Sequence, residues 1–124
     1  DHPPIETVED LKGHRMIGYI PDMIFDKELD YLSDLGIGRV ALASNSVAVQ
    51  IKMVAQGTGL CVAHDFSLPF HRPLRKILTK EISLTRSFYL VRHQSDQRSE
   101  RLNRFAEALS RGMREEVARL EGLT

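Results

Sequence analysis

The chain has 124 residues, the length of one modest domain or of one part of a larger one. Its 17 basic residues are balanced by 17 acidic ones, which argues against a strongly basic nucleic-acid-binding protein and against an acidic disordered tail. Hydrophobic residues make up 42%, as in ordinary globular proteins, and no apolar run approaches the roughly 20 residues of a membrane span.

The N-terminus and the cysteine content bear on the compartment. Residues 1–4 have neither the basic nor the apolar region of a signal peptide, and without an initiator Met we expect a cut fragment or a processed product. The single cysteine, Cys61, has no internal disulfide partner. A cytoplasmic location is therefore the simplest expectation.

The first half of the chain predicts short alternating strands and helices. The apolar run 14–20 predicts a buried strand that Pro21 ends. Asp26 is a predicted N-cap for the next helix, and Gly36 is placed to end it in a left-handed conformation. A second strand is predicted over residues 39–43.

A run of N-cap residues follows this second strand. Ser44, Asn45 and Ser46 precede a helical pattern that Gly57 ends, and residues 60–63 predict a third strand. Strand, helix, strand, helix and strand with short connections predict a parallel α/β sheet flanked by helices.

The C-terminal part predicts one more strand and a long helix. Residues 65–80 are irregular, whereas residues 84–91 are rich in β-branched and aromatic residues and predict a strand. The final helix is expected to begin at Ser95 or Asp96, with an apolar stripe along one side. Its opposite face carries acid-first i,i+4 pairs, namely Glu100/Arg104, Glu107/Arg111 and Glu115/Arg119.

The chain contains the residue types of one catalytic and one metal-binding arrangement, without the sequence pattern of either. Ser44, His64 and Asp65 supply the residue types of a hydrolase triad, but the G-x-S-x-G elbow is absent, so we favour a capping serine and two loop residues. Zinc needs three or four converging ligands, and Cys61 with His64 and His71 falls short of a recognisable pattern. We therefore expect no catalytic residue, no metal and no cofactor.

The chain also offers two candidate anion sites. The cluster Arg72, Arg75 and Lys76 lacks interleaved aromatic residues, so a solvated surface is the better interpretation. The turn Ser44-Asn45-Ser46 places polar side chains and free helical N–H groups at the carboxyl end of a strand. Ligands bind there in open α/β sheets, and the helix dipole favours an anion.

The ordered set of segments resembles a known family. Residues 2–5 (HPPI) and 8–13 (VEDLKG) precede the first strand, and residues 53–62 read MVAQGTGLCV after a serine-led helix. With the strand over 84–91 and the amphipathic helix, this order is similar to the effector-binding domain of LysR-type transcriptional regulators. One departure is His64-Asp65, where the family usually has a proline after the third strand.

This resemblance implies a fold like that of type II periplasmic binding proteins, in which two α/β subdomains close over a small effector. Residues 1–83 would form the second regulatory subdomain, and residues 84–124 the return strand and C-terminal helix of the first. The effector-binding residues it implies lie in three segments: Ile20, Pro21 and Asp22; Ser44, Asn45 and Ser46; and His64.

The resemblance also implies the partners of the chain. These are a small metabolite as effector, a homodimer or tetramer, and promoter DNA bound through a winged helix-turn-helix that is absent from these residues; no membrane is expected. An alternative is a solute-binding protein on the same fold, against which the free Cys61 and the lack of an export signal argue. A small hydrolase is a third, less favoured interpretation.

Overall fold

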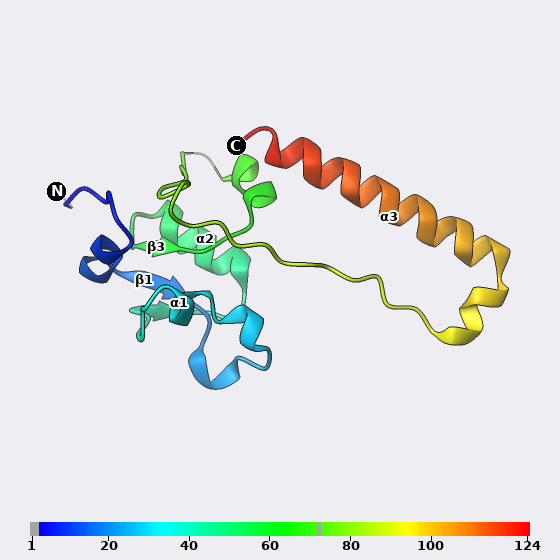
Figure 1. Cartoon of the computed structure of the whole chain (residues 1–124), viewed down its shortest axis with the longest axis horizontal. Coiled ribbons are helices and arrows are strands. Elements are labelled where there is room, and N and C mark those ends of the chain that lie inside the picture. The colour runs from blue at the N-terminus through cyan, green and yellow to red at the C-terminus, as the bar shows by residue number, and fades with distance from the viewer. Residues whose placement is uncertain (1–2, 72) are drawn as a thin grey trace.

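A three-stranded parallel sheet forms the centre of the N-terminal part, in a computed structural model that describes residues 3–71 and 73–124 (Figure 1). Strand β1 (Met16–Gly18) lies between β2 (Leu42–Ala43) and β3 (Leu60–Cys61) and pairs in parallel with both. The predicted parallel α/β sheet is therefore confirmed, although each strand is shorter than its apolar run.

The connection from β1 to β2 contains short helical turns in place of one long helix. Asp26 caps the 3-10 turn η3 (Lys27–Leu29) by accepting a hydrogen bond from the Glu28 N–H at 2.9 Å. Asp30 then leaves helical geometry and caps α1 (Tyr31–Asp34). The expected single helix after Asp26 is therefore wrong, because a second capping aspartate interrupts it, whereas Gly36 has the predicted left-handed φ of 72°.

The connection from β2 to β3 follows the prediction closely. Helix α2 (Val47–Ala55) begins after Ser46, whose Oγ accepts a hydrogen bond from the Val49 N–H. Gly57 ends the helix with a φ of 75°. A Cβ at Gly59 would collide with the carbonyl oxygen of Arg15, so only glycine lets β3 approach β1 there.

The hydrophobic core of the N-terminal part includes the central strand β1. Ile17 is fully buried in this central strand, and Met16 beside it is 4% exposed. The other buried apolar side chains of this part come from 3-10 turn η1 (Glu9–Gly13), from α1 and α2, and from the loops: Leu11, Leu32, Ile37, Ile51 and Leu78. Leu11, Met16, Leu32, Ile37 and Leu78 form one small hydrophobic cluster in this part of the chain.

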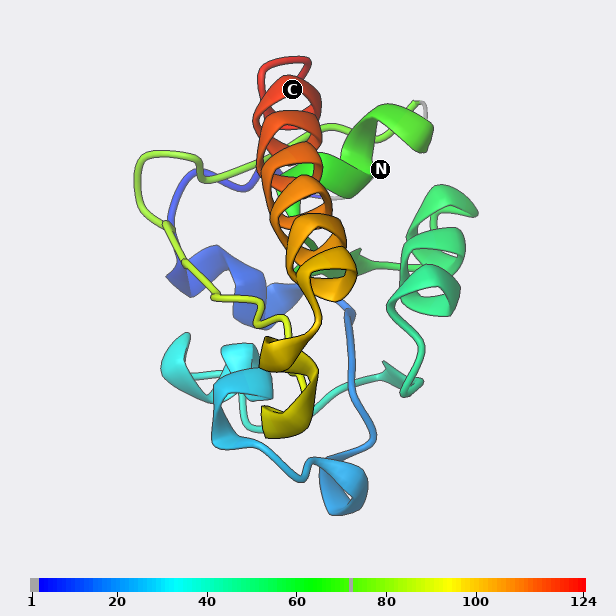
Figure 2. The same cartoon turned by 90° about the vertical axis from the view of Figure 1, so that its right-hand side faces the viewer.

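The long helix α3 (Glu100–Glu121) projects away from the sheet and its helices (Figures 1 and 2). Its N-cap is Ser99, whose Oγ accepts from the Leu102 N–H. The expected caps Ser95 and Asp96 are wrong because both lie in a separate 3-10 turn, η5 (Gln94–Arg98). At the other end, α3 contacts the 3-10 turn η4 (Asp65–Phe70).

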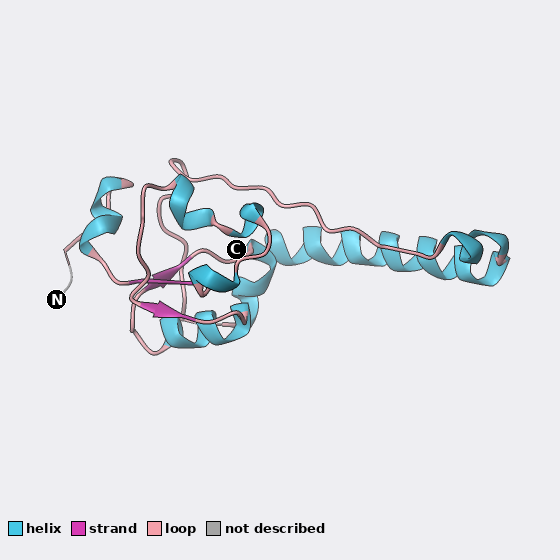
Figure 3. Cartoon of the chain, turned by 90° about the horizontal axis from the view of Figure 1, so that it is seen from below, coloured by secondary structure: helices cyan, strands magenta, loops and turns pink. Residues whose placement is uncertain are grey.

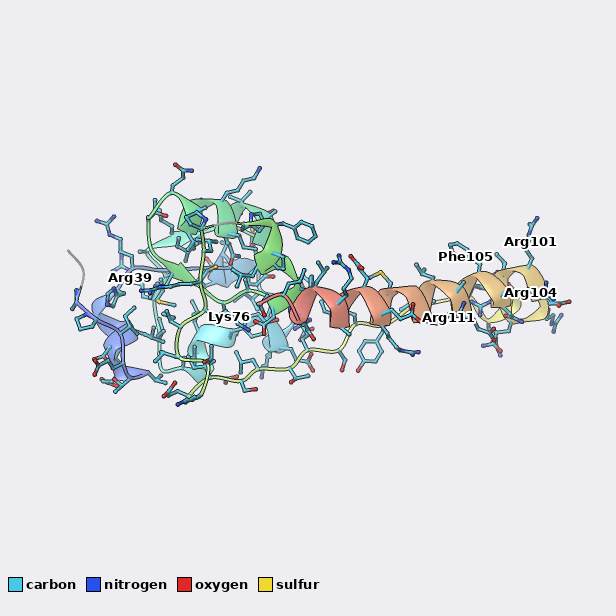
Figure 4. The ribbon with its side chains drawn as sticks, turned by 90° about the horizontal axis from the view of Figure 1, so that it is seen from above. Arg39, Lys76, Arg101, Arg104, Phe105 and Arg111 are labelled. Carbon is cyan, nitrogen blue, oxygen red and sulfur yellow. The ribbon has the colours of Figure 1, made fainter. Side chains whose placement is uncertain are left out.

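The ion pairs along α3 agree with the prediction only in part. Glu100 and Arg104 form the expected pair at 3.0 Å. Arg119 instead pairs with Glu116 at 2.7 Å rather than with Glu115. Figure 4 shows Arg104 and Arg111 projecting from the helix into solvent, and Arg111 forms no ion pair with another described residue.

The predicted strand over residues 84–91 is an extended segment that joins no sheet within the described residues. It runs outward from the sheet and its helices to η5, which lies at the far end of α3 (Figures 1 and 3). A strand needs a neighbour to accept its backbone hydrogen bonds, and no described segment supplies one. The predicted strand over residues 84–91 is therefore wrong for the described part of the chain, because the segment has no neighbouring strand there.

Candidate functional site

The carboxyl ends of the three strands open on the same edge of the sheet, because the strands are parallel. Tyr19 to Asp22 follow β1, Ser44 to Ser46 follow β2, and Val62 to His64 follow β3. Since β1 is central, the segments after β2 and β3 are separated by two strand spacings, roughly 10 Å. All seven predicted effector-binding residues therefore lie along this edge.

The turn 44–46 is held by hydrogen bonds to its own residues and to the sheet. The Ser44 N–H donates to the Gly18 carbonyl at 2.9 Å, which extends the pairing of β2 with β1. The Ser44 Oγ accepts from the Ser46 N–H at 3.1 Å. Ser44 is half-buried, whereas Asn45 and Ser46 are exposed.

Two backbone N–H groups at the start of α2 remain available. Those of Val47 and Ala48 donate to no other described residue, since the Ser46 side chain is used by Val49. The first turn of α2 contains no acidic side chain that would neutralise the positive end of the helix dipole. This turn is therefore suited to an anion. Asp22, which follows β1, carries a negative charge and would repel an anion that lay near it.

A buried glutamine supports this turn from below. Gln50 is 2% exposed, and its Nε2 donates to the Ser44 carbonyl at 2.6 Å. The sequence analysis missed this residue. Its signal is a polar side chain within the apolar face of α2, one turn before Val54.

Asn45 joins the segments that follow β1 and β2. Its Oδ1 accepts from the Ile20 N–H at 3.4 Å, and its Nδ2 lies 3.3 Å from the Met23 Sδ. Ile20 is the N-cap of the 3-10 turn η2 (Pro21–Met23), and Met23 is its last residue. The structure therefore brings the first two predicted groups together, and it adds Met23 to them.

His64 belongs to an aromatic cluster instead of to the serine turn. Its ring stacks on Phe66 with a centroid distance of 5.0 Å and meets the edge of Phe88 at 5.2 Å. Burial, assisted by the positive charge of Arg86, lowers the pKa of His64 below its ordinary value. A neutral imidazole packed on phenylalanines is suited to contact with an apolar group.

The structure bears on the three arrangements that the sequence analysis disfavoured. Asp65 pairs with Lys76 at 3.1 Å, so it does not orient His64 as a triad would require. Among the described residues, no group of His, Cys, Asp and Glu side chains converges on a metal position. In the Arg72, Arg75 and Lys76 cluster, Arg72 lies outside the described residues, and Lys76 is engaged by Asp65 and Thr124 (Figure 4).

Cys61 lies half-buried in β3, and burial raises the pKa of its thiol to about 11. A thiol with this pKa is almost entirely protonated near neutral pH, and so it is a weak nucleophile and a poor metal ligand. This environment fits the expected role as a small core residue.

A cavity of about 360 Å³ lies between the sheet and the connection from β1 to β2. It is lined by apolar residues of β1, α1 and the loop before β2, with Lys27 and Arg39 among its polar neighbours. Of the predicted effector-binding residues only Pro21 borders it. Tyr19, Gln50 and Val62 also line it, so the cavity reaches the carboxyl edge of the sheet.

Comparison with known proteins identifies the family. The family model described as the LysR substrate binding domain matches residues 1–114. Neither the curated proteins nor the solved structures that were compared include a match to the chain. No helix among the described residues is long and apolar enough to cross a membrane.

The match accounts for the architecture. LysR substrate binding domains have a type II periplasmic-binding-like fold, and they belong to transcriptional regulators, in which they sense effectors. The parallel sheet with flanking helices observed here agrees with that fold. The chain therefore belongs to the LysR substrate binding domain family.

Proposed function

We propose that the chain senses a small anionic metabolite at the carboxyl edge of the sheet. The observation that carries this proposal is the turn 44–46. The N–H groups of Val47 and Ala48 donate to no other described residue, and the Ser44 Oγ accepts from the Ser46 N–H. A carboxylate placed there would accept hydrogen bonds from both N–H groups at the positive end of α2. The effector would be recognised without a positively charged side chain.

The other predicted residues would make the remaining contacts with the effector. Ile20 and Pro21 would border the effector on one side, with Asp22 disfavouring a second negative group near η2. His64 would offer an apolar ring surface on the other side of β1. This arrangement favours an effector with a negative group at one end and an apolar or uncharged body.

We further propose that residues 1–83 form the second regulatory subdomain and that residues 84–124 belong to the first. In its support, the main contacts of α3 with described residues are limited to its ends, at η4 and η5. The side chains of Phe105 and Met113 are 65% and 58% exposed. An amphipathic helix with this much bare apolar surface needs a further packing partner.

The assembled regulator would then be a dimer or tetramer in the cytoplasm, and promoter DNA would be bound by a winged helix-turn-helix outside these residues. The net charge of zero supports this division, because the chain has no excess of basic side chains with which to neutralise phosphates. No reaction is proposed for the chain. Binding of the effector would change the affinity of the assembly for DNA.

The decisive experiment is Ser44→Val in the full-length regulator, with a promoter reporter screened against a library of metabolites. We expect the variant to lose the response to the carboxylate that activates or represses the unsubstituted regulator. Folding and DNA affinity should be retained. Ser83→Val is the matched control, because Ser83 is an exposed serine away from the edge. A normal response of Ser44→Val would show that the serine is only structural.

A further inference from the structure

Arg86 connects the extended segment to the loop that follows β1. Its Nη2 donates to the Asp26 Oδ2 at 3.0 Å, and its Nη1 lies 3.7 Å from the Glu28 Oε2. The Arg86 side chain is only 18% exposed, and its Nη1 is buried without a hydrogen-bond partner among the described residues. A buried guanidinium held by two carboxylates is costly to move away from them.

The extended segment turns alternate side chains toward the rest of the chain. Tyr89 and Val91 point outward, with exposures of 83% and 87%. Arg86 is largely buried, and the ring of Phe88 contacts His64 and Phe66. The segment is therefore attached to the subdomain by one ion-pair cluster and one aromatic cluster.

The same carboxylate organises the loop at the candidate site. Asp26 uses its Oδ1 to cap η3 and its Oδ2 to hold Arg86. This loop begins at Ile20, which is hydrogen-bonded to Asn45 at the edge. A chain of contacts thus runs from Asn45 through the loop to Arg86.

The contacts continue from the segment into α3. The Arg92 Nη2 donates to the Asn103 Oδ1 at 2.8 Å and to the Asp96 carbonyl at 3.2 Å. Arg86 is the one ion-pairing side chain among the described residues that links segment 84–92 to the loop between β1 and α1. Its removal would leave the contact of the Phe88 ring with His64 and Phe66 as the remaining attachment, and Phe88 is 69% exposed.

We propose that Arg86 is a positioning residue that couples the loop beside the candidate effector site to the segment leading to α3. A shift of residues 20–28 then moves Asp26 and Glu28, and Arg86 carries segment 84–92 with them. The regulatory meaning of this coupling rests on the proposed function, but the coupling itself requires no effector. It can therefore be measured on the chain alone, and its failure is distinguishable from failure to bind a metabolite.

The test is a distance measurement by electron spin resonance. In a Cys61→Ala background, Lys52→Cys on α2 and Tyr89→Cys on the segment provide two exposed positions for nitroxide labels. With the labelled chain diluted by unlabelled copies, so that distances between copies do not contribute, we expect a single narrow distance peak. Arg86→Met should abolish that peak and leave a broad distribution. Arg75→Met, at an exposed arginine outside the cluster, should retain it.

Two further variants distinguish coupling from general loosening. Asp26→Asn keeps an oxygen for the η3 cap but removes the charge, and it should abolish the peak as Arg86→Met does, with no added effect in the double variant. Asn45→Ala should move the peak when Arg86 is present and should have no further effect in Arg86→Met. Circular dichroism checks that each variant is folded.

Specific results would overturn the proposal. An unchanged peak in folded Arg86→Met would mean that other contacts position the segment. An equal effect of Asn45→Ala with and without Arg86 would mean that the two sites are not coupled through this side chain. If Arg86→Met unfolds, the Asp26→Asn distribution decides: retention of the narrow peak refutes the proposal.

Discussion

Phe105→Glu tests whether the exposed face of α3 is an interface. Phe105 and Met113 are 65% and 58% exposed, and Leu102 and Leu109 are each 38% exposed. Together these fractions equal about two whole apolar side chains, whose burial would stabilise by about 3–6 kcal/mol. Figure 4 shows Phe105 projecting from α3 far from the sheet, so its replacement leaves the core intact.

In the absence of the first subdomain, we expect a second copy to cover this face. Two copies bury two such faces, worth about 6–12 kcal/mol, while association itself costs roughly 4 kcal/mol or more. This balance allows a dimer at tens of micromolar protein, a range that corresponds to about 6–7 kcal/mol of net binding. Sedimentation equilibrium should then give a mass above the 14.1 kDa of the monomer.

The substitution should return the chain to a folded monomer, because a glutamate at the centre of the face would be buried without a partner. Phe25→Glu is the matched control, since Phe25 is 91% exposed and lies in the loop after β1. The reasoning is refuted if the unsubstituted chain is a monomer at these concentrations. It is also refuted if Phe105→Glu unfolds the chain, which would indicate internal packing of α3.

Three other results are expected. Ile17→Ala should lower the free energy of unfolding by about 2–5 kcal/mol in urea titrations, because Ile17 is fully buried in the central strand; a loss below about 1 kcal/mol contradicts the assigned core. Since burial lowers the pKa of His64 below 6.5, the folded state favours the neutral ring, and stability should fall as the pH drops below 6.5 and through the folded pKa; His64→Gln should reduce this dependence, and an unchanged pH profile would exclude His64 as its source. The isolated chain should bind no promoter DNA specifically; fluorescence anisotropy showing specific binding tighter than about micromolar would contradict this.

The sequence was sufficient for those features that depend on local chemistry. The start of α2 after the run Ser44-Asn45-Ser46 and the glycines at 36 and 57 were predicted because capping and a positive φ have strong residue preferences. The parallel sheet followed from the alternation of apolar runs with helical patterns. The cap of α3 was misplaced because several polar residues in a row can serve, and residues 94–98 form a 3-10 turn of their own before Ser99.

Features that depend on contacts between distant residues were not predicted. Gln50 reads as an ordinary helical residue until its hydrogen bond to the Ser44 carbonyl is seen. Arg86 lies 60 positions from Asp26, and nothing in either local pattern indicates the pair. The extended state of residues 84–91 has the same origin, because a strand is completed only by its neighbour.

Hydrogen exchange of the full-length regulator, with and without carboxylate metabolites, tests the effector site most directly. A bound carboxylate should slow exchange in a peptide containing Val47 and Ala48, whose N–H groups are otherwise free, and in a peptide containing Ile20. Ser44→Val should abolish both effects. Protection confined to residues 27–40, which include cavity-lining residues away from the carboxyl edge, or binding only of uncharged or cationic metabolites, would contradict an anion site at that edge of the sheet.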